Sequence, residues 1–389
     1  MHILEIPSFF PPLGGAFSLD QAKALQARGH EVRMIVCNQL GIKATPKLIL
    51  SESVRRWEED IDGVRVYRTN MYGIPRSVYH NQKRWCRIIV SMYHDYVRKY
   101  GKPDILHAHC CKWAGVAASM IAKEENIPFY ITEHLSSVLF ERDFGHEWNK
   151  DTWAKDLLTK TYHEANCVIP VSEELVENLA PFFGKAYRYI PVSNIIDTDF
   201  YAYKERTNTK DRKFRFCCLA VANIHGKGYD VLAEAMRGLD EIELHIAGRG
   251  TDSKEMRALF SENSNIVFHG ELDKYGVRDL LYKCDALVLA SRCEAQPLVI
   301  LEAMSTGIPM VGTEVIPQSE RIEGACLIAK TGNAESLRDK MMECKSIKPS
   351  KNYANAVRRM ASPEIISEKL ETIFYDKDAE AHISHSLHI

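Results

Sequence analysis

Two glutamates, Glu294 and Glu302, are the residues whose type and spacing are best suited to chemistry. Glu294 follows the apolar run 286–290, and Glu302 lies two turns into the helix predicted at 297–306. Their separation of eight residues corresponds to about 2.2 helical turns, so both carboxylates can point along one face toward one extended ligand. A carboxylate in so apolar a helix needs a partner, and ligand hydroxyl groups would serve. The alternative is a glutamate exposed to solvent.

Two glycine-containing turns could bind phosphate. Gly14 and Gly15 lie between a predicted strand and a predicted helix, where glycines let backbone N–H groups approach an anion at the helix N-terminus. The segment 223–228 follows the first predicted strand of the second half, and its Lys227 can meet phosphate. Neither turn has the spacing of a dinucleotide-binding fingerprint or of a P-loop, so a tight turn and a surface lysine are the alternatives.

These residues are positioned by an alternation of apolar runs and helical stretches that occurs twice along the chain. Strands are predicted at 3–6, 31–37, 64–68, 105–108, 129–132 and 167–171, and then at 214–221, 243–247, 266–269, 286–290, 310–312 and 326–328. Helices are predicted at 17–28, 84–99, 113–125, 151–165 and 173–180, and then at 229–237, 254–261, 275–282, 297–306 and 365–374. The pattern indicates an α/β protein with two Rossmann-like, doubly wound domains that face each other across a cleft. In such sheets ligands bind beyond the carboxyl ends of the strands.

The domain limits follow from this alternation. We expect a first domain at 1–200 and a second domain at 201–362, with the charged run 207–213 leading into the second sheet. A C-terminal helix at 363–376 is expected to pack back on the first domain, and the polar tail 377–389 is expected to be disordered.

Composition narrows the class of protein further. The 50 basic and 52 acidic side chains nearly cancel, which excludes an overall basic field that would recruit nucleic acid. Eleven cysteines without a C-x-x-C pair favour a reduced, cytoplasmic protein and argue against a zinc ribbon. The N-terminus lacks the pattern of a signal peptide, and no apolar run has the roughly 18 residues of a membrane span. We therefore expect a cytoplasmic location.

Together, these motifs resemble the retaining glycosyltransferases of family 4, which have the GT-B fold. The segment 294–302 resembles that family's E-x7-E motif, the segment 12–15 its N-terminal glycine loop, and Lys227-Gly228 its lysine-glycine turn. Further matches in the same order are 104–109 (Asp-Ile-Leu-His-Ala-His), 132–134 (Thr-Glu-His), 170–172 (Pro-Val-Ser) and 190–197. The resemblance covers nearly the whole chain, and it implies that the first domain, 1–200, binds the acceptor and the second domain, 201–362, binds the nucleotide-sugar.

The resemblance implies that a sugar is transferred from a nucleotide-sugar, with UDP favoured over GDP, to a saccharide or lipid-linked acceptor with retention of anomeric configuration. The nucleotide-sugar is then a co-substrate, and no metal is required. By similarity, Glu302 would bind the ribose, Glu294 the donor sugar, and Lys227 the diphosphate. His134 would lie by the sugar and the acceptor and, with Lys227 and Glu294, make the catalytic set. The implied donor site also includes Gly14, Gly15, Asn223, Gly248, Gly270, Ala295, Gln296 and Leu298.

The chain departs from the family pattern at two places. Asn223 stands where an arginine usually grips the diphosphate, and Gln296 replaces a residue that is commonly Phe or Gly. The missing arginine keeps open a catalytically inactive sugar-nucleotide-binding protein. A second alternative is a nucleotide-sugar 2-epimerase of the same fold, which would act on the donor alone. The expected pathway is the synthesis of a cell-surface polysaccharide or glycolipid.

The first half carries two further candidates. The segment 76–102 contains seven basic residues, including Arg84 and Arg87, and only one acidic residue, and apolar side chains are interleaved with them. This pattern predicts either an amphipathic helix that docks on an anionic membrane surface or a packing helix with a solvated basic face. His109 is assigned to the acceptor side. His107, His109 and His134 could alternatively be a zinc cluster, because imidazoles that follow neighbouring strands can converge.

Overall fold

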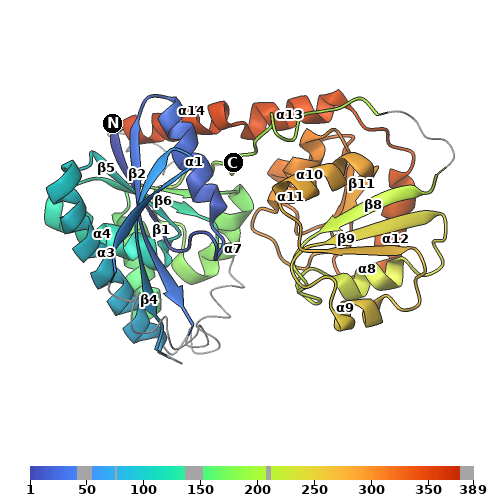
Figure 1. Ribbon diagram of the computed structural model, residues 1–389, viewed down its shortest axis with the longest axis horizontal. Helices are drawn as coiled ribbons and strands as arrows, with labels where there is room; N and C mark the ends of the chain where they lie inside the picture. The colour runs from blue at the N-terminus through green and yellow to red at the C-terminus, as the bar shows by residue number, and fades with distance from the viewer. Residues whose placement is uncertain (42–54, 75–76, 136–151, 207–211, 377–389) are drawn as a thin grey trace. The chain divides into compact units, whose positions relative to one another are not determined.

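The computed structural model describes residues 1–41, 55–74, 77–135, 152–206 and 212–376, so the predicted tail and residues 207–211 of the predicted linker lie outside the described residues. The chain divides into two compact units (Figure 1). The first unit consists of Met1–Ile195 and the residues from Ile366 onward, and the second is Ile196–Ile365. Each unit is built around one β-sheet.

The sheet of the first unit has seven strands in the order β3-β4-β2-β1-β5-β6-β7. All neighbours are parallel except β3, which forms an antiparallel hairpin with β4 at the edge. The strands are β1 (His2–Pro7), β2 (Glu31–Leu40), β3 (Trp57–Ile61), β4 (Val64–Tyr72), β5 (Ile105–His109), β6 (Phe129–Glu133) and β7 (Cys167–Pro170). The central strands β1, β5 and β6 are buried at nearly every position, as expected when helices cover both faces.

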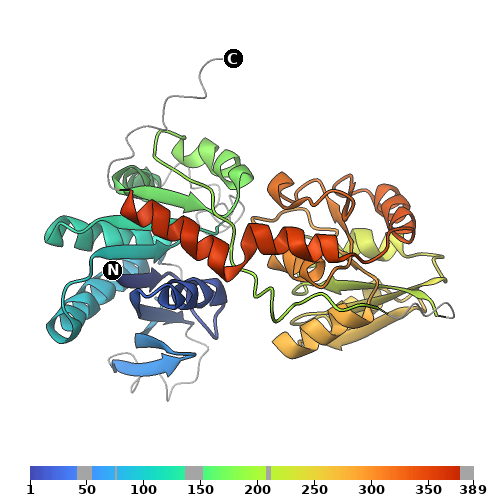
Figure 2. The same cartoon turned by 90° about the horizontal axis from the view of Figure 1, so that it is seen from above.

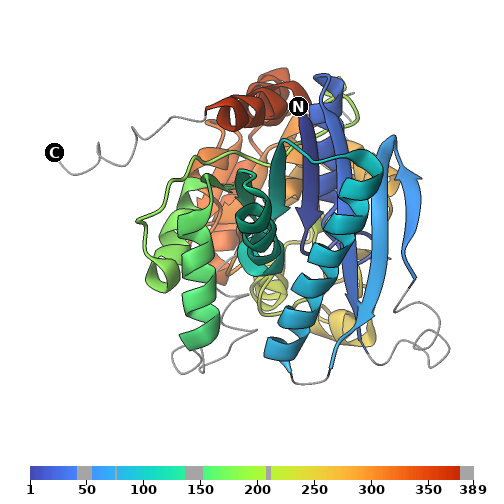
Figure 3. The same ribbon diagram turned by 90° about the vertical axis from the view of Figure 1, so that its left-hand side faces the viewer.

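Helices cover both faces of this sheet. They are α1 (Ala16–Ala27), α3 (Val78–Tyr100), the π-helical turn η1 (Cys111–Gly115), α4 (Val116–Glu125), α6 (Thr152–Glu164), α7 (Glu173–Phe183) and the C-terminal α14 (Pro363–Tyr375). Ile366, Leu370 and Phe374 of α14 share one buried cluster with residues of α1 and β1, and Figure 2 shows α14 in red over this unit. The helices α3, α4 and α6 pack on the other face (Figure 3).

The second unit contains a six-stranded, entirely parallel sheet in the order β10-β9-β8-β11-β12-β13. The strands are β8 (Phe214–Leu219), β9 (Ile242–Ala247), β10 (Ile266–Gly270), β11 (Ala286–Val288), β12 (Met310–Thr313) and β13 (Cys326–Ala329). The helices are α8 (Tyr229–Ala235), α9 (Lys254–Leu259), α10 (Lys274–Lys283), α11 (Leu298–Ser305), the 3-10 turn η3 (Gln318–Glu320), α12 (Ala334–Cys344) and α13 (Lys351–Ala361). Two Rossmann-like α/β units are therefore present, as predicted.

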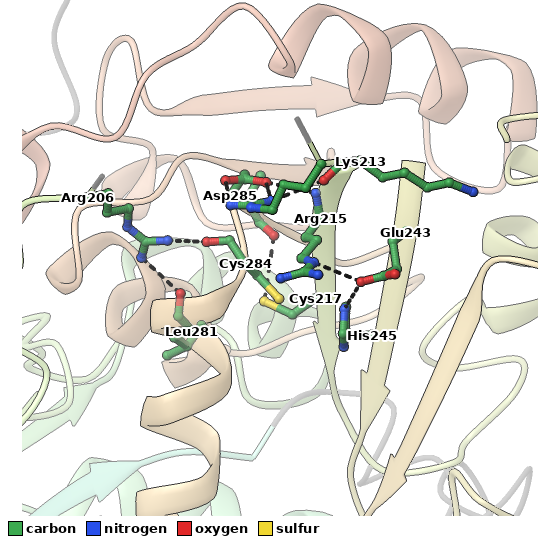
Figure 4. Close-up of polar contacts among 11 residues, drawn as sticks. Arg206, Lys213, Arg215, Cys217, Glu243, His245, Leu281, Cys284 and Asp285 are labelled. Carbon is green, nitrogen blue, oxygen red and sulfur yellow. Dashed lines mark hydrogen bonds and ion pairs between the residues drawn. The ribbon is translucent and has the colours of Figure 1, made fainter. Parts of the chain in front are cut away.

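A polar network holds the amino ends of the strands in the second unit (Figure 4). The Arg206 guanidinium donates to the carbonyl oxygens of Leu281, at 2.9 Å, and Cys284, at the end of α10. Arg212 binds both oxygens of Asp285 at 2.6 and 2.7 Å. These contacts fasten both ends of the segment that leads into β8, so the network lies at the edge of the sheet opposite the predicted site.

Candidate active site

The loops that follow the parallel strands of the second unit lie at one edge of its sheet, because parallel strands end on the same side. The loop after β8 carries Asn223 and Lys227, and the loop after β11 carries Glu294. Gly248 follows β9, and Gly270 is the last residue of β10; the Gly248 N–H donates to the Gly270 carbonyl at 2.7 Å. The sheet thus gathers the predicted donor-site residues of this unit at its carboxyl edge.

Lys227 and Glu294 form an ion pair at the centre of this edge. The Nζ of Lys227 lies 2.7 Å from Oε1 of Glu294, and the same oxygen accepts a 2.6 Å hydrogen bond from the Ser291 hydroxyl. The Glu294 side chain is only 8% exposed and that of Lys227 is 24% exposed, so the carboxylate is held firmly while the ammonium group keeps contact with solvent. A fixed carboxylate beside a partly exposed ammonium group can bind hydroxyls and phosphate together.

Gly228 makes this pair possible. Its φ of +66° is left-handed, and a Cβ at this position would lie 1.9 Å from the carbonyl oxygen of Ala290. Only glycine allows the turn after β8 to approach the end of β11 so closely. Arg292 binds both carboxylate oxygens of Asp230, in the first turn of α8, at 2.7 Å and therefore ties the two loops together a second time.

Asn223, which stands where an arginine was expected, has a structural task in the turn. Its side-chain oxygen accepts a 3.0 Å hydrogen bond from the Gly226 N–H, and its carbonyl accepts one from the Lys227 N–H at 2.8 Å. The side chain closes the turn on itself, as asparagine commonly does. Its oxygen thereby fixes the backbone immediately before Lys227.

The predicted helical relation between Glu294 and Glu302 is wrong. The helix α11 begins at Leu298, one residue after the predicted start, and Glu302 is its fifth residue. Glu294 lies in the loop before the helix, as predicted, so a spacing counted in helical turns does not apply to the pair. Pro297 suits the N-cap position because proline cannot continue a helix toward its N-terminal side. The predicted backbone donors Ala295 and Gln296 precede the helix, and Leu298 is its first residue.

In the first unit, Gly14 and Gly15 follow β1 and lead into α1. Gly15 has a φ of +81°, and a Cβ there would lie 2.2 Å from the Phe9 carbonyl oxygen, so the turn requires glycine. Two residues further, the Phe17 ring stacks on the His134 imidazole with ring centroids 3.6 Å apart. The glycine loop and His134 therefore belong to one corner of this unit.

His134 is held rigidly at the end of β6 by its neighbour. The buried Glu133 carboxylate accepts backbone N–H groups from Cys111, His134 and Leu135, each at 2.9 Å, and the Tyr162 hydroxyl at 2.6 Å. Burial raises the pKa of Glu133, although these hydrogen bonds oppose the shift. Burial, with smaller effects of His109 and His107, lowers the pKa of His134 well below its ordinary value, so its imidazole is neutral.

The histidine cluster includes an acidic residue that the sequence analysis missed. His107 and His109 both contact Glu5, in β1, whereas His134 contacts the far nitrogen of His109 at 3.4 Å. The three predicted zinc ligands therefore do not converge on one point, and Glu5, His107 and His109 do. A charged residue inside the otherwise apolar run 3–6, next to a strand with two histidines, was the available signal.

The basic residues of α3 are arranged as a packing helix. Trp85, Ile89 and Met92 are buried in the first unit, and the Trp85 indole N–H donates to the Cys37 carbonyl at 2.8 Å. Arg84 donates to the Tyr72 carbonyl, whereas Arg87 is exposed. The apolar side chains that were expected to face lipid are thus mostly used inside the protein. Over the part of the chain that the structure describes, no helix combines the length and apolar character needed to cross a bilayer.

Comparisons with known proteins agree with this architecture. A model of the family "Glycosyl transferase 4-like domain" matches residues 14–194, and a model of "Glycosyl transferases group 1" matches 215–345. The putative teichuronic acid biosynthesis glycosyltransferase TuaC of Bacillus subtilis is 25% identical over 335 residues, which is 81% of each chain. N-acetyl-alpha-D-glucosaminyl L-malate synthase of Bacillus anthracis is 24% identical over 70% of this chain and 74% of its own.

Solved structures share the fold at low identity. Sucrose-phosphate synthase from Thermosynechococcus elongatus has a TM-score of 0.76 at 16% identity, covering 96% of this chain and 98% of that one. HepE of Anabaena in complex with UDP has a TM-score of 0.68 at 16% identity, covering 96% and 99%. The two Rossmann-like units and these likenesses show the GT-B fold, and the matched family models show a glycosyltransferase. Within that class, the chain belongs to glycosyltransferase family 4.

Proposed function

We propose that this glycosyltransferase transfers a hexose or N-acetylhexosamine from a UDP-sugar, with a GDP-sugar as second choice, to a saccharide or lipid-linked acceptor. The product would be a cell-surface polysaccharide or glycolipid. The observation that carries the proposal is the Lys227–Glu294 pair at the carboxyl edge of the second sheet. The pathway named for TuaC and the UDP bound to HepE support the polysaccharide product and the uridine nucleotide.

In this proposal, Lys227 stabilises the diphosphate leaving group. Negative charge grows on the diphosphate as the glycosidic bond breaks, and a partly desolvated ammonium group stabilises this charge more in the transition state than in the ground state. Ser291 and Lys227 hold Glu294 in place to accept hydrogen bonds from donor-sugar hydroxyls. The Glu302 carboxylate accepts hydrogen bonds from the ribose hydroxyls.

We further propose that the reaction retains anomeric configuration without an enzymic nucleophile and without a metal ion. The leaving phosphate itself takes the proton of the acceptor hydroxyl, so no side chain has to form a covalent intermediate. Lys227 supplies positive charge at the diphosphate, which is one of the tasks that a metal ion performs in other transferases. The backbone N–H groups of Ala295, Gln296 and Leu298 would add further donors toward the donor's sugar and phosphates.

A lipid-linked acceptor is supported by an exposed apolar patch at the start of α3. Ile74, Val78 and Tyr79 are 44%, 39% and 38% exposed, and the Lys83 ammonium lies 4.1 Å from the centroid of the Tyr79 ring. Apolar and basic groups side by side suit a lipid phosphate at the surface of a membrane. We accordingly place the protein in the cytoplasm, in peripheral contact with anionic lipid. Co-sedimentation with anionic but not zwitterionic liposomes is the expected result, and no binding to either excludes a membrane surface.

Calorimetric titration with UDP, GDP and their common sugar conjugates tests the donor site. We expect one nucleotide class to bind the wild type and to bind Glu302→Ala more weakly, because the ribose loses its carboxylate partner. Product analysis by NMR then tests the reaction: an α-linked donor should give an α-linked product. Conversion of the donor without an acceptor would instead identify a 2-epimerase. Binding without any turnover would identify an inactive sugar-nucleotide-binding protein.

A further inference from the structure

A buried carboxylate lies behind the predicted catalytic corner of the first unit. Glu5, in the central strand β1, has no exposed surface, and its neighbours on β5 are the equally buried His107 and His109. Oε2 of Glu5 lies 2.7 Å from Nε2 of His109, and Oε1 lies 3.1 Å from Nδ1 of His107. Although burial opposes ionisation, these imidazoles lower the pKa of Glu5 to about 2, so the carboxyl group is charged.

The charge on Glu5 fixes the direction of the hydrogen bonds that follow. A carboxylate can only accept, so Nε2 of His109 carries a proton and donates it. Burial lowers the pKa of His109, which leaves its other nitrogen, Nδ1, as a bare acceptor. This Nδ1 lies 3.4 Å from Nε2 of His134, so the neutral His134 donates from Nε2 and keeps no proton on its own Nδ1.

The remaining nitrogen of His134, Nδ1, ends the series of hydrogen bonds from Glu5 through His109. This Nδ1 is buried and has no hydrogen-bond partner among the described residues. Buried polar atoms rarely lack a partner unless a ligand or water supplies one. The Phe17 ring stacked on the imidazole and the Glu133 carboxylate on the backbone leave His134 little freedom to turn.

We propose that Glu5 is a positioning residue for the transfer reaction: acting through His109, it fixes His134 in the tautomer whose bare Nδ1 accepts a hydrogen bond from a substrate hydroxyl. This role rests on the proposed function, since it requires a hydroxylated substrate in the first unit. It parallels the way in which a buried carboxylate orients a catalytic imidazole in hydrolytic triads. An unprotonated ring nitrogen can accept a hydrogen bond from a hydroxyl group but makes none with an ether oxygen. The Glu5–His109–His134 hydrogen bonds would therefore also help to select the substrate.

A metal ion is the competing explanation for the same cluster. One carboxylate oxygen and one nitrogen from each of His107 and His109 lie close enough together to ligate a metal ion. Hydrogen bonds between Glu5 and the two imidazoles account for these ligand atoms without an ion. The second nitrogen of His107 also has a partner, the Thr132 hydroxyl at 2.7 Å. Elemental analysis of the purified protein decides between the two, and zinc at one equivalent would overturn the proposal.

The direct test is nitrogen-15 NMR of the histidine rings in the wild-type protein, because it reads each ring nitrogen as protonated or bare and needs no turnover. We expect His134 to show a protonated Nε2 and a bare Nδ1, with no averaging between tautomers. In Glu5→Gln one carboxylate oxygen becomes an NH2 donor and the charge is lost, so the side chain can pair with a bare or with a protonated imidazole nitrogen and no longer fixes the tautomer of His109. Averaged resonances are therefore expected for His134. A proton on Nδ1 of His134 in the wild type, or averaged resonances there, would overturn the proposal.

The kinetic test separates positioning from simple support of the fold. We expect Glu5→Gln to lower kcat tenfold or more while the affinity for UDP, which is bound by the second unit, stays within about twofold. The matched control is Thr132→Val, which is equally buried and bonded to His107 but lies outside the path to His134. Its kcat should stay near the wild-type value, and an equal loss in the control would overturn the positioning role.

A double variant completes the test. In a His134→Ala background, Glu5→Gln should cause no further loss of kcat, because the group that Glu5 positions is already gone. Additive losses would show that Glu5 acts elsewhere and overturn the proposal. If the wild type binds nucleotide but transfers no sugar, the proposed function fails and the substrate role of His134 fails with it. The ring nitrogens then still report whether the hydrogen-bond chain itself exists.

Discussion

Replacing Lys227 by methionine should separate the two tasks of its ammonium group. The 2.7 Å contact with Glu294 is lost, and the carboxylate, only 8% exposed, keeps the Ser291 hydroxyl as a partner. A buried polar group that loses one partner costs about 1–3 kcal/mol, and the 24% exposure of Lys227 places the expected loss of stability at the low end. The loss of one preorganised donor at the leaving group lowers kcat by about 100- to 1,000-fold.

The assay measures release of the nucleoside diphosphate at saturating donor and acceptor concentrations, and thermal unfolding is measured in parallel. The double variant Lys227→Met/Glu294→Gln is the control for stability, because it removes the stranded charge along with its partner. We expect it to regain most of the lost stability and none of the lost turnover. A Lys227→Met protein whose kcat stays within threefold of wild type would refute a role for Lys227 at the diphosphate. Recovery of turnover in the double variant would show that the pair is only structural.

Three further outcomes are expected. Gly228→Ala should unfold at markedly lower temperature and lose nucleotide affinity in calorimetry, because its Cβ would lie 1.9 Å from the Ala290 carbonyl oxygen. Arg206→Ala should lower the free energy of unfolding by about 1–3 kcal/mol in urea titrations without changing UDP affinity, since it frees two carbonyl oxygens at the edge away from the donor site. The pKa of Glu5 is lowered on folding, so its contribution to stability is present above the pKa of the unfolded chain and is lost as pH falls toward 2; Glu5→Gln should flatten this acid limb.

Most of the fold could be predicted from the sequence because each buried parallel strand is a short apolar run. The run 129–132 became β6 with one residue added, and the apolar stretch beginning at Phe214 became β8. Elements that are exposed on one side were harder to predict. The edge strand β3 contains three acidic residues, and α12 and α13 are largely polar, so hydrophobicity did not mark them. The remaining signals were local: Asp62-Gly63 in the β3–β4 turn, and the helix N-caps Asn333 and Ser350.

The site was predictable where chemistry and backbone geometry coincide. Lys227 and Gly228 were singled out by type, and the structure brings Lys227 to Glu294 as a strand–loop–helix arrangement requires. Ser291 and Glu5 were missed because their importance comes from pairing across the sheet, which spacing along the chain does not encode. The helical spacing between Glu294 and Glu302 was wrong because Glu294 lies in the loop before Pro297, where the chain is not helical.

The return of α14 to the first unit constrains how the protein can be made and divided. Ile366, Leu370 and Phe374 complete the core of that unit, yet they leave the ribosome after all of 196–365. The first unit therefore cannot cover one apolar side of its sheet until the second unit has been synthesised. The second unit is a contiguous segment and can fold in the meantime. A shortened chain that stops before α14 should aggregate, and exchange of the second unit between relatives needs two junctions, near 195 and 365, instead of one.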